Sequence, residues 1–220
     1  MKKSIAVIGL GRFGQAIVRT LKDSKCEVLA IDNNKDRVTE TSKYVQNCII
    51  CDSTKIEHLE DSGIRNVTHA VICIGKNIQS SLLTLINLKE LGVEKITVRV
   101  DGDEYIKVMQ SLGANEIIYP EKDFGVDFAK RISIKDSNIE NYFELSNGYV
   151  QVEFKINENF TPIKIKELKP ISKFEVIVNL IDREGQSILP DGETEIQPGD
   201  TIYAVGKHAK VIKFDDYLNG

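Results

Sequence analysis

Three glycines and one acidic residue near the start of the chain have the spacing of a nucleotide-binding site. A short apolar run leads into Gly9-x-Gly11-x-x-Gly14, and Asp32 follows the last glycine by eighteen residues. Gly9 would allow a tight turn, Gly11 would leave room for a pyrophosphate, and Gly14 would let the next helix pack against a sheet with its amides facing the anion. Asp32 ends the following apolar run, where a carboxylate can accept both ribose hydroxyls. The combination predicts a nucleotide site rather than a plain turn.

Arg12 lies inside this glycine loop, at the point where the chain would bend over the phosphates. A guanidinium there would add bidentate charge to a site that is already rich in amide donors. The terminal phosphate of a mononucleotide has more use for that charge than the pyrophosphate of a dinucleotide. On spacing alone, a solvated arginine at the start of a helix explains the residue equally well.

The composition is that of an ordinary globular protein and argues against several classes of function. The chain is 41% hydrophobic and 28% charged, and its net charge of −4 argues against a nucleic-acid-binding surface. No apolar run approaches the roughly 20 residues of a membrane span, and the first residues do not have the pattern of a signal peptide. We therefore expect a cytoplasmic protein that binds no nucleic acid.

The cysteines and histidines do not predict a metal site. Cys48 and Cys51 are three residues apart on a predicted strand, so that their side chains point to opposite faces. We interpret all four cysteines as buried free thiols of a reducing compartment. The three histidines are scattered and lack the spacing of paired ligands.

The first 120 residues alternate between short apolar runs and amphipathic segments, which predicts a doubly wound, Rossmann-like α/β fold with a parallel six-stranded sheet. The predicted strands are 4–8, 27–31, 47–51, 69–74, 95–100 and 116–119. The predicted helices are about 12–23, 35–44, 55–62, 79–91 and 103–112.

The pattern changes after residue 122, where a helix at 126–134 is followed by a second, small α+β domain. Its predicted strands are 149–156, 174–181, 187–189 and 201–205, and its predicted helices are 164–168 and 207–218. We therefore expect a nucleotide-binding domain at 1–122, a crossover helix and linker at 123–145, and a C-terminal domain at 146–220. A domain of about 75 residues has a marginal core and gains stability by pairing.

Ligands of an open α/β sheet bind outside the carboxyl ends of the strands. Besides the glycine loop, this rule selects four segments: Asp32-Asn33-Asn34, Asp52-Ser53, Ile74-Gly75-Lys76 and Arg99-Val100-Asp101. Asp52 and Ser53 would hydrogen-bond an adenine edge, or Asp52 would cap a helix, and we hold the two readings level. Gly75 would allow a close approach of the backbone, or it is a turn glycine.

The chain lacks the residues of the common catalytic sites. A dehydrogenase needs a proton-transfer group over the nicotinamide, and the predicted sheet domain offers none. The spacing of Tyr203 and Lys207 matches a Tyr-x-x-x-Lys pair, but both lie in the small domain and we interpret this as coincidence. The chain also lacks a phosphate-binding loop of the Gly-x-x-x-x-Gly-Lys type. A site that binds a nucleotide without chemistry predicts a sensor.

Three short motifs are together more specific than the glycine loop alone. They are Gly-Leu-Gly-Arg-Phe-Gly at 9–14, Ile-Gly-Lys-Asn-Ile-Gln at 74–79 and Tyr-Pro-Glu-Lys-Asp-Phe-Gly at 119–125. With Asp32 they resemble the RCK family, in particular the cytoplasmic regulatory subunits of Ktr/Trk-type potassium uptake systems. The likeness covers essentially all 220 residues.

The resemblance implies a regulatory protein without enzymatic activity, peripheral to the inner face of the membrane. Homodimers would assemble into an octameric ring beneath a membrane-embedded potassium transport subunit, with ATP favouring the conducting state and ADP the resting state. Arg12 would reach the terminal phosphate, in its own or a neighbouring subunit, and Glu121 would help bind a cation such as Mg²⁺ or Na⁺. The other positions that match nucleotide contacts of the family are Gly9, Gly11, Phe13, Gly14, Asp32, Asn33, Asn34, Asp52, Ser53, Ile74, Gly75, Lys76, Arg99, Val100, Asp101 and Tyr105.

Three alternatives stay open at the level of the sequence, and one of them is a purely structural domain that assembles into the ring without use of a ligand. Asp32 would also accept the ribose of NAD or NADH, as in an NAD(H)-binding regulator or an NAD-dependent oxidoreductase. Some members of the family bind cyclic di-AMP between paired C-terminal domains, using apolar residues and an arginine. Ile171 takes the place of that arginine here, which argues against this ligand, and Pro170 should stiffen the loop.

Overall fold

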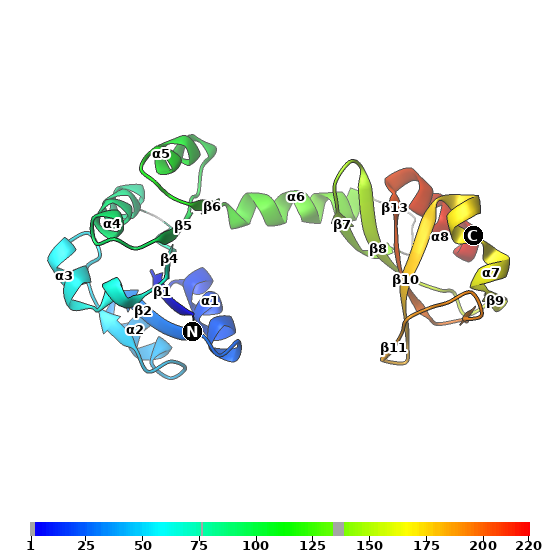
Figure 1. The fold of residues 1–220 in the computed structure, drawn as a ribbon, viewed down its shortest axis with the longest axis horizontal. Coiled ribbons are helices and arrows are strands. Elements are labelled where there is room, and N and C mark those ends of the chain that lie inside the picture. Colours follow the sequence, from blue (N-terminus) through cyan, green and yellow to red (C-terminus); the bar gives the residue numbers. More distant parts are fainter. Residues whose placement is uncertain (1–2, 76, 134–138) are drawn as a thin grey trace. The chain divides into compact units, whose positions relative to one another are not determined.

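The computed structural model describes residues 3–75, 77–133 and 139–220. The chain divides into two compact units, Met1–Lys122 and Asp123–Gly220, which are described separately (Figure 1). Among the described residues, no helix is long and apolar enough to cross a membrane.

The first unit is built around a six-stranded parallel sheet in the order β3-β2-β1-β4-β5-β6. The predicted fold class, a doubly wound Rossmann-like sheet with a second small domain, is confirmed. The strands are β1 (Ser4–Ile8), β2 (Glu27–Asp32), β3 (Cys48–Ile50), β4 (His69–Ile72), β5 (Lys95–Arg99) and β6 (Glu116–Ile118). The helices are α1 (Arg12–Asp23), α2 (Lys35–Thr41), α3 (Ile56–Asp61), η1 (Ile64–Asn66), α4 (Ile78–Glu90), η2 (Asp103–Tyr105) and α5 (Ile106–Ser111).

Helices cover both faces of this sheet. Alternate residues of each strand point to opposite faces, so each strand contributes to two cores. Ile8 and Ile72 belong to a core beneath α3, α4 and α5, whereas Val7 and Val71 belong to a second core beneath α1 and α2. Figure 1 shows α1 and α2 in blue on one side of these strands, with α4 and α5 in teal and green on the other. The strand order reverses between β1 and β4, so the adjacent loops diverge there and leave room for a ligand.

Helix α6 (Pro120–Ser133) begins six residues before the predicted start at residue 126. Proline is well suited to the first turn of a helix because its φ is already helical and it has no amide to leave unpaired. The last predicted residue of that helix, Ile134, lies outside the described residues. The predicted helix at 103–112 is divided into η2 and α5.

The second unit contains a five-stranded sheet in the order β11-β10-β13-β8-β7 and a two-stranded sheet of β9 and β12. All of its strand pairs are antiparallel. The strands are β7 (Ile139–Glu144), β8 (Tyr149–Lys155), β9 (Ile163–Lys164), β10 (Val176–Arg183), β11 (Gln186–Ile188), β12 (Glu195–Ile196) and β13 (Thr201–Lys207). The helical segments are α7 (Ile165–Leu168), η3 (Pro170–Phe174) and α8 (His208–Asn219).

Several features of this unit were not predicted from the sequence, among them the strands β7, β9 and β12. Strand β7 lies within the segment 123–145 and pairs with β8, an arrangement that depends on the partner strand more than on its own pattern. The strand predicted from residue 174 begins instead at Val176. Lys169 and Glu175 flank the π-helical turn η3 and both have left-handed backbones, with φ of 52° and 58°, so an extended strand cannot begin earlier.

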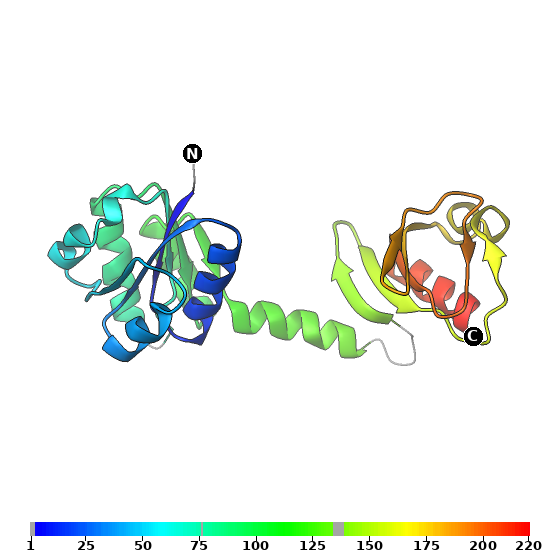
Figure 2. The same cartoon turned by 90° about the horizontal axis from the view of Figure 1, so that it is seen from below.

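The core of the second unit joins helix α8 to the sheet. Phe214 of α8 meets Phe154 of β8 edge to face, with ring centroids 6.1 Å apart, and Figure 2 shows α8 in red against the strands. Arg183 donates two hydrogen bonds to the buried carboxylate of Asp200, at 2.8 and 2.9 Å, and a third to the carbonyl of Glu195. These bonds compensate for the burial of the Asp200 charge.

Candidate nucleotide-binding site

A cavity of about 1030 Å³ lies at the carboxyl ends of the strands of the first unit. Each of the strands β1 to β5 contributes a residue at its end or directly after it, and helix α6, which follows β6, contributes Glu121. The lining residues are Ile8, Gly9, Leu10, Gly11, Arg12, Phe13, Gln15, Asp32, Asn33, Arg37, Glu40, Cys51, Asp52, Ser53, Thr54, Cys73, Ile74, Gly75, Asn77, Ser80, Arg99 and Glu121. The cavity is large enough for a mononucleotide or a dinucleotide.

The three glycines of the loop have different physical roles. Gly9 has a φ of 97°, and a Cβ atom there would lie 2.9 Å from the carbonyl carbon of Cys73. At Gly14, a Cβ would lie only 2.0 Å from the carbonyl oxygen of Gly9, so this glycine lets α1 pack against the loop. A Cβ at Gly11 would meet no atom within 4 Å, which leaves open space at the start of α1. Gly9 and Gly14 are therefore required by the fold, and Gly11 is not.

Asp32 is almost completely buried, and its carboxylate is tied to the backbone around the cavity. The amide of Leu10 donates to Oδ2 at 2.6 Å, and the amide of Asn34 donates to Oδ1 at 2.8 Å. Arg37 adds an ion pair to Oδ2 at 3.4 Å. Oδ1, with one donor, has a further lone pair with which it can accept a ribose hydroxyl, whereas Oδ2 already has two donors.

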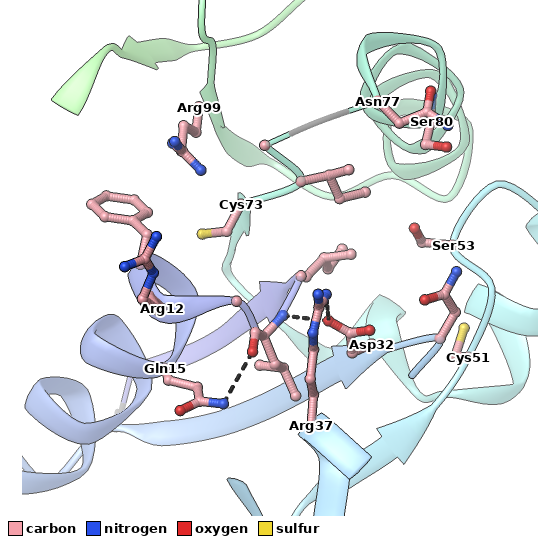
Figure 3. A pocket seen from close by; sticks show the side chains of 18 of the residues that line it. Arg12, Gln15, Asp32, Arg37, Cys51, Ser53, Cys73, Asn77, Ser80 and Arg99 are labelled. Carbon is pink, nitrogen blue, oxygen red and sulfur yellow. Dashed lines mark hydrogen bonds and ion pairs between the residues drawn. The ribbon is translucent and has the colours of Figure 1, made fainter. Parts of the chain in front are cut away.

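Two arginines lie at one end of the cavity. In Figure 3, Arg12 and Arg99 are on the left, Cys51 and Ser53 are on the right, and Asp32 lies between. The Arg12 side chain is exposed, and among residues 3–75, 77–133 and 139–220 it has no hydrogen-bond or ion-pair partner. The amides at the start of α1 face the same end of the cavity, which makes it suitable for an anion.

The guanidinium of Arg99 is held by its neighbours. A Cβ at position 75 would lie 2.4 Å from Nη1 of Arg99, so a larger residue there would displace this guanidinium from its present position. The ring of Phe13 lies 5.5 Å from the guanidinium carbon, and Glu121 accepts a hydrogen bond from Nη2. Gly75 thus makes room for a side chain, a role that neither a turn glycine nor a backbone approach would predict.

Asp52 and Ser53 are engaged with the protein itself. Asp52 Oδ1 accepts hydrogen bonds from the hydroxyl and the amide of Thr54, at 2.7 and 3.1 Å, and this lowers the pKa of Asp52. The buried hydroxyl of Ser53 lies 2.7 Å from that of Thr84 in α4. Asp52 therefore shapes the turn before α3, whose N-cap residue is Lys55. Its second carboxylate oxygen is the atom that could meet a base.

Two thiols line the cavity. Burial raises the pKa of the Cys73 thiol to about 12, and burial together with the nearby Asp52 raises that of Cys51 to about 11. Both thiols are therefore protonated at neutral pH and unsuited to nucleophilic chemistry.

Several residues that the sequence singled out do not line the cavity. Asn34 caps α2 by accepting a hydrogen bond from the amide of Arg37. After Arg99 the chain turns into the core, where Val100 is 2% exposed and Tyr105 is partly buried. Gly14 and Asp101 also lie outside the lining, and Lys76 lies outside the described residues.

Several polar residues that the sequence did not single out also line the cavity, most of them near the start of a helix. They are Gln15, Arg37, Glu40, Thr54, Asn77 and Ser80. Asn77 caps α4 by accepting a hydrogen bond from the amide of Ser80 at 3.0 Å. The first turns of helices after parallel strands meet at the ligand edge, and that rule would have found Arg37 and Asn77.

The family models matched by the chain cover both units. The TrkA-N domain matches residues 5–120, and the TrkA-C domain matches residues 149–219. The chain belongs to the TrkA-N/TrkA-C family of RCK-type proteins.

Curated members of this RCK-type family match over nearly the whole chain. The Ktr system potassium uptake protein C of Bacillus subtilis is 37% identical over 218 residues, which cover 98% of this chain and 97% of that protein. The Ktr system potassium uptake protein A of the same organism is 35% identical, with coverage of 97% and 96%.

Solved structures of RCK-containing proteins share the fold. The GsuK channel bound to NAD has a TM-score of 0.64 at 12% identity, and the match covers all of this chain and 40% of that one. GsuK bound to ADP has a TM-score of 0.54 at 12% identity, with coverage of 62% and 36%. This RCK-type chain thus corresponds to less than half of the channel chain.

Proposed function

We propose that the protein is an ATP- and ADP-sensing regulatory subunit of a potassium uptake system, without enzymatic activity of its own. The observation that carries the proposal is that one cavity holds both an acid suited to bind ribose, Asp32, in its middle and two arginines, Arg12 and Arg99, at one end. The full-length similarity to the Ktr potassium uptake proteins supports the transport role.

The described residues fit a nucleotide with terminal phosphates. Arg12 is exposed at the start of α1 without a partner among the described residues, and Arg99 has a buried Nε with no hydrogen bond. Phosphate oxygens can accept hydrogen bonds from guanidinium donors that lack a partner, and the amides at the start of α1 add to such a site. A dinucleotide would place its pyrophosphate there and leave less charge to neutralise.

We include a cation near the phosphates in the proposal, with Glu121 as a ligand. Among the described residues of one chain, no three His, Cys, Asp or Glu side chains gather to hold a metal ion. Glu121 alone would therefore need oxygens from the phosphates, or from a second subunit, to complete the coordination of Mg²⁺ or Na⁺.

We further propose that the protein forms dimers that assemble into an octameric ring, in the cytoplasm beneath a membrane-embedded potassium transport subunit. In this scheme the segment 1–122 binds the nucleotide, the segment 123–145 crosses over to a neighbour, and the segment 146–220 pairs. Several apolar side chains of α6 are exposed in the single chain, among them Phe124 and Ile132, which supports burial in an assembly.

Thermal-shift titration tests the nucleotide, because a ligand that binds only the native state raises the melting temperature. We expect ATP and ADP to raise it, and cyclic di-AMP to leave it unchanged, because Ile171 offers no charge to a phosphate. Stabilisation by NADH with no effect of ATP or ADP would contradict the proposal. If no nucleotide raised the melting temperature, a purely structural role in assembly would be favoured.

An NAD(H)-binding regulator is the second candidate. The GsuK channel with the same fold has been solved with NAD and with ADP, and the cavity volume accommodates either. Calorimetry with equal concentrations of ADP and NADH separates the two, since only the first candidate predicts tighter binding of ADP.

A further inference from the structure

Arg99 and Glu121 connect the cavity to the start of a long helix. Arg99 is the last residue of β5, Glu121 lies in the first turn of α6, and both line the cavity. Their ion pair joins a side chain that is 16% exposed to one that is 60% exposed. Helix α6 continues past Lys122, the last residue of the first unit.

One hydrogen-bond donor of the Arg99 guanidinium lacks an acceptor in the described part of the chain. Its Nε is buried and has no hydrogen-bond partner among the described residues. The guanidinium lies beside Gly75 and 5.5 Å from the ring centroid of Phe13, while Glu121 engages only Nη2. A buried donor without a partner is unfavourable, and this arrangement would be relieved by an acceptor that offers several oxygens.

We propose that Arg99 exchanges Glu121 for a phosphate group when a nucleotide binds, and that this exchange loosens the first turn of α6, which Lys122 still ties to Asp103. The inference rests on the nucleotide-binding function proposed above. A phosphate presents several charged oxygens to a guanidinium and can be bound in a bidentate manner, which a single carboxylate oxygen on Nη2 does not match. Glu121 is mostly exposed, so its carboxylate is readily hydrated after release.

The exchange gives the cavity a means to act on α6. With the cavity empty, Glu121 ties the helix start to the end of β5. With phosphate on Arg99, that tie is broken and Glu121 becomes available to a cation or to another chain. Before binding, the Glu121 carboxylate competes with the nucleotide for Arg99. After binding, the same carboxylate no longer has Arg99 as its partner.

Competition makes a counterintuitive prediction for the variant Glu121→Gln. In EDTA, which removes divalent cations, we expect it to bind ADP about two- to fivefold more tightly than the wild type, the range that a partly exposed ion pair allows. Glu40→Gln is the matched control, because Glu40 lines the same cavity but accepts its hydrogen bond from Gln15. An equal gain in both variants would mean a general effect of charge and would overturn the proposal.

A double-mutant cycle attributes the gain to the pair. In an Arg99→Gln background, Glu121→Gln should no longer improve ADP affinity, because the competing partner is gone. A gain that persists in that background overturns the exchange. A wild-type protein that binds neither ATP nor ADP would refute the proposed function, whereas binding without coupling between the two residues would refute only the exchange.

Amide hydrogen exchange measures the loosening of the start of α6 directly. It needs no substitution of Arg99. We expect ADP to accelerate amide exchange at residues 121–128 in the wild type. In Glu121→Gln these amides should exchange at the accelerated rate before ADP is added. Unchanged exchange in the wild type, despite saturating ADP, would contradict the loosening of α6.

Discussion

The backbone amide of Leu10 donates a hydrogen bond to Oδ2 of Asp32 at 2.6 Å, so the acid at the end of β2 also holds the glycine loop. The other carboxylate oxygen accepts the amide of Asn34. Asp32 thus fixes the shape of the loop and, in the proposed function, binds the ribose.

Replacing Asp32 by alanine should therefore reduce both stability and nucleotide binding. The amides of Leu10 and Asn34 would lose their acceptors, which lowers the free energy of unfolding by about 1–3 kcal/mol. ATP and ADP should both lose affinity, because they share the ribose. Urea denaturation and calorimetry measure the two effects, with the exposed Asp36→Ala as control. Full affinity for both nucleotides would show that the acid has another role.

Alanine at two glycines of the loop should give opposite results. In Gly14→Ala the new methyl group would lie 2.0 Å from the carbonyl oxygen of Gly9, and we expect a loss of about 1–3 kcal/mol or more of stability. In Gly11→Ala the methyl group enters open space, so the melting temperature should hardly change while ADP affinity falls. A wild-type melting temperature in Gly14→Ala, or wild-type ADP affinity in Gly11→Ala, would contradict these roles.

Arg12→Ala should weaken ATP more than ADP. Only ATP carries a γ-phosphate, and a charge-assisted hydrogen bond to it contributes about tenfold or more in affinity. Calorimetric titration of both nucleotides measures the difference, and Lys22→Ala, at the other end of α1, serves as control. Equal losses for ATP and ADP would refute a contact with the terminal phosphate.

The buried thiols predict a decrease of stability in alkali. The pKa of the Cys73 thiol is raised to about 12 from the ordinary value of 9.0, so the unfolded chain releases this proton first as the pH rises. The contribution of the protonated Cys73 thiol to the free energy of unfolding is fully present below pH 9.0 and is lost between that pH and about 12. Unfolding free energies measured from pH 7 to 10 should therefore decline, and less steeply in Cys73→Ala. Identical slopes in the two proteins would contradict the burial of this thiol.

The parts of the fold predicted most closely were those in which the apolar residues of a short segment are the ones that become buried. The strands of the parallel sheet are buried on both faces, so their apolar runs are visible without knowledge of their neighbours. Strand β7 is different, because only its pairing with β8 makes it a strand. The turn at 170–174 depends on left-handed backbones at Lys169 and Glu175, which residue types do not reveal.

The sequence by itself determined the glycine loop, the acid that follows β2 and the alternation that places them at one edge of a parallel sheet. Those features are local, because each depends on the backbone freedom or the polarity of nearby residues. Only the tertiary structure decided which side chains meet across that edge. Gly75 makes room for Arg99, and Arg99 reaches Glu121, 22 residues further along the chain. Contacts between the ends of different strands are set by sheet order and register, which bring distant residues together.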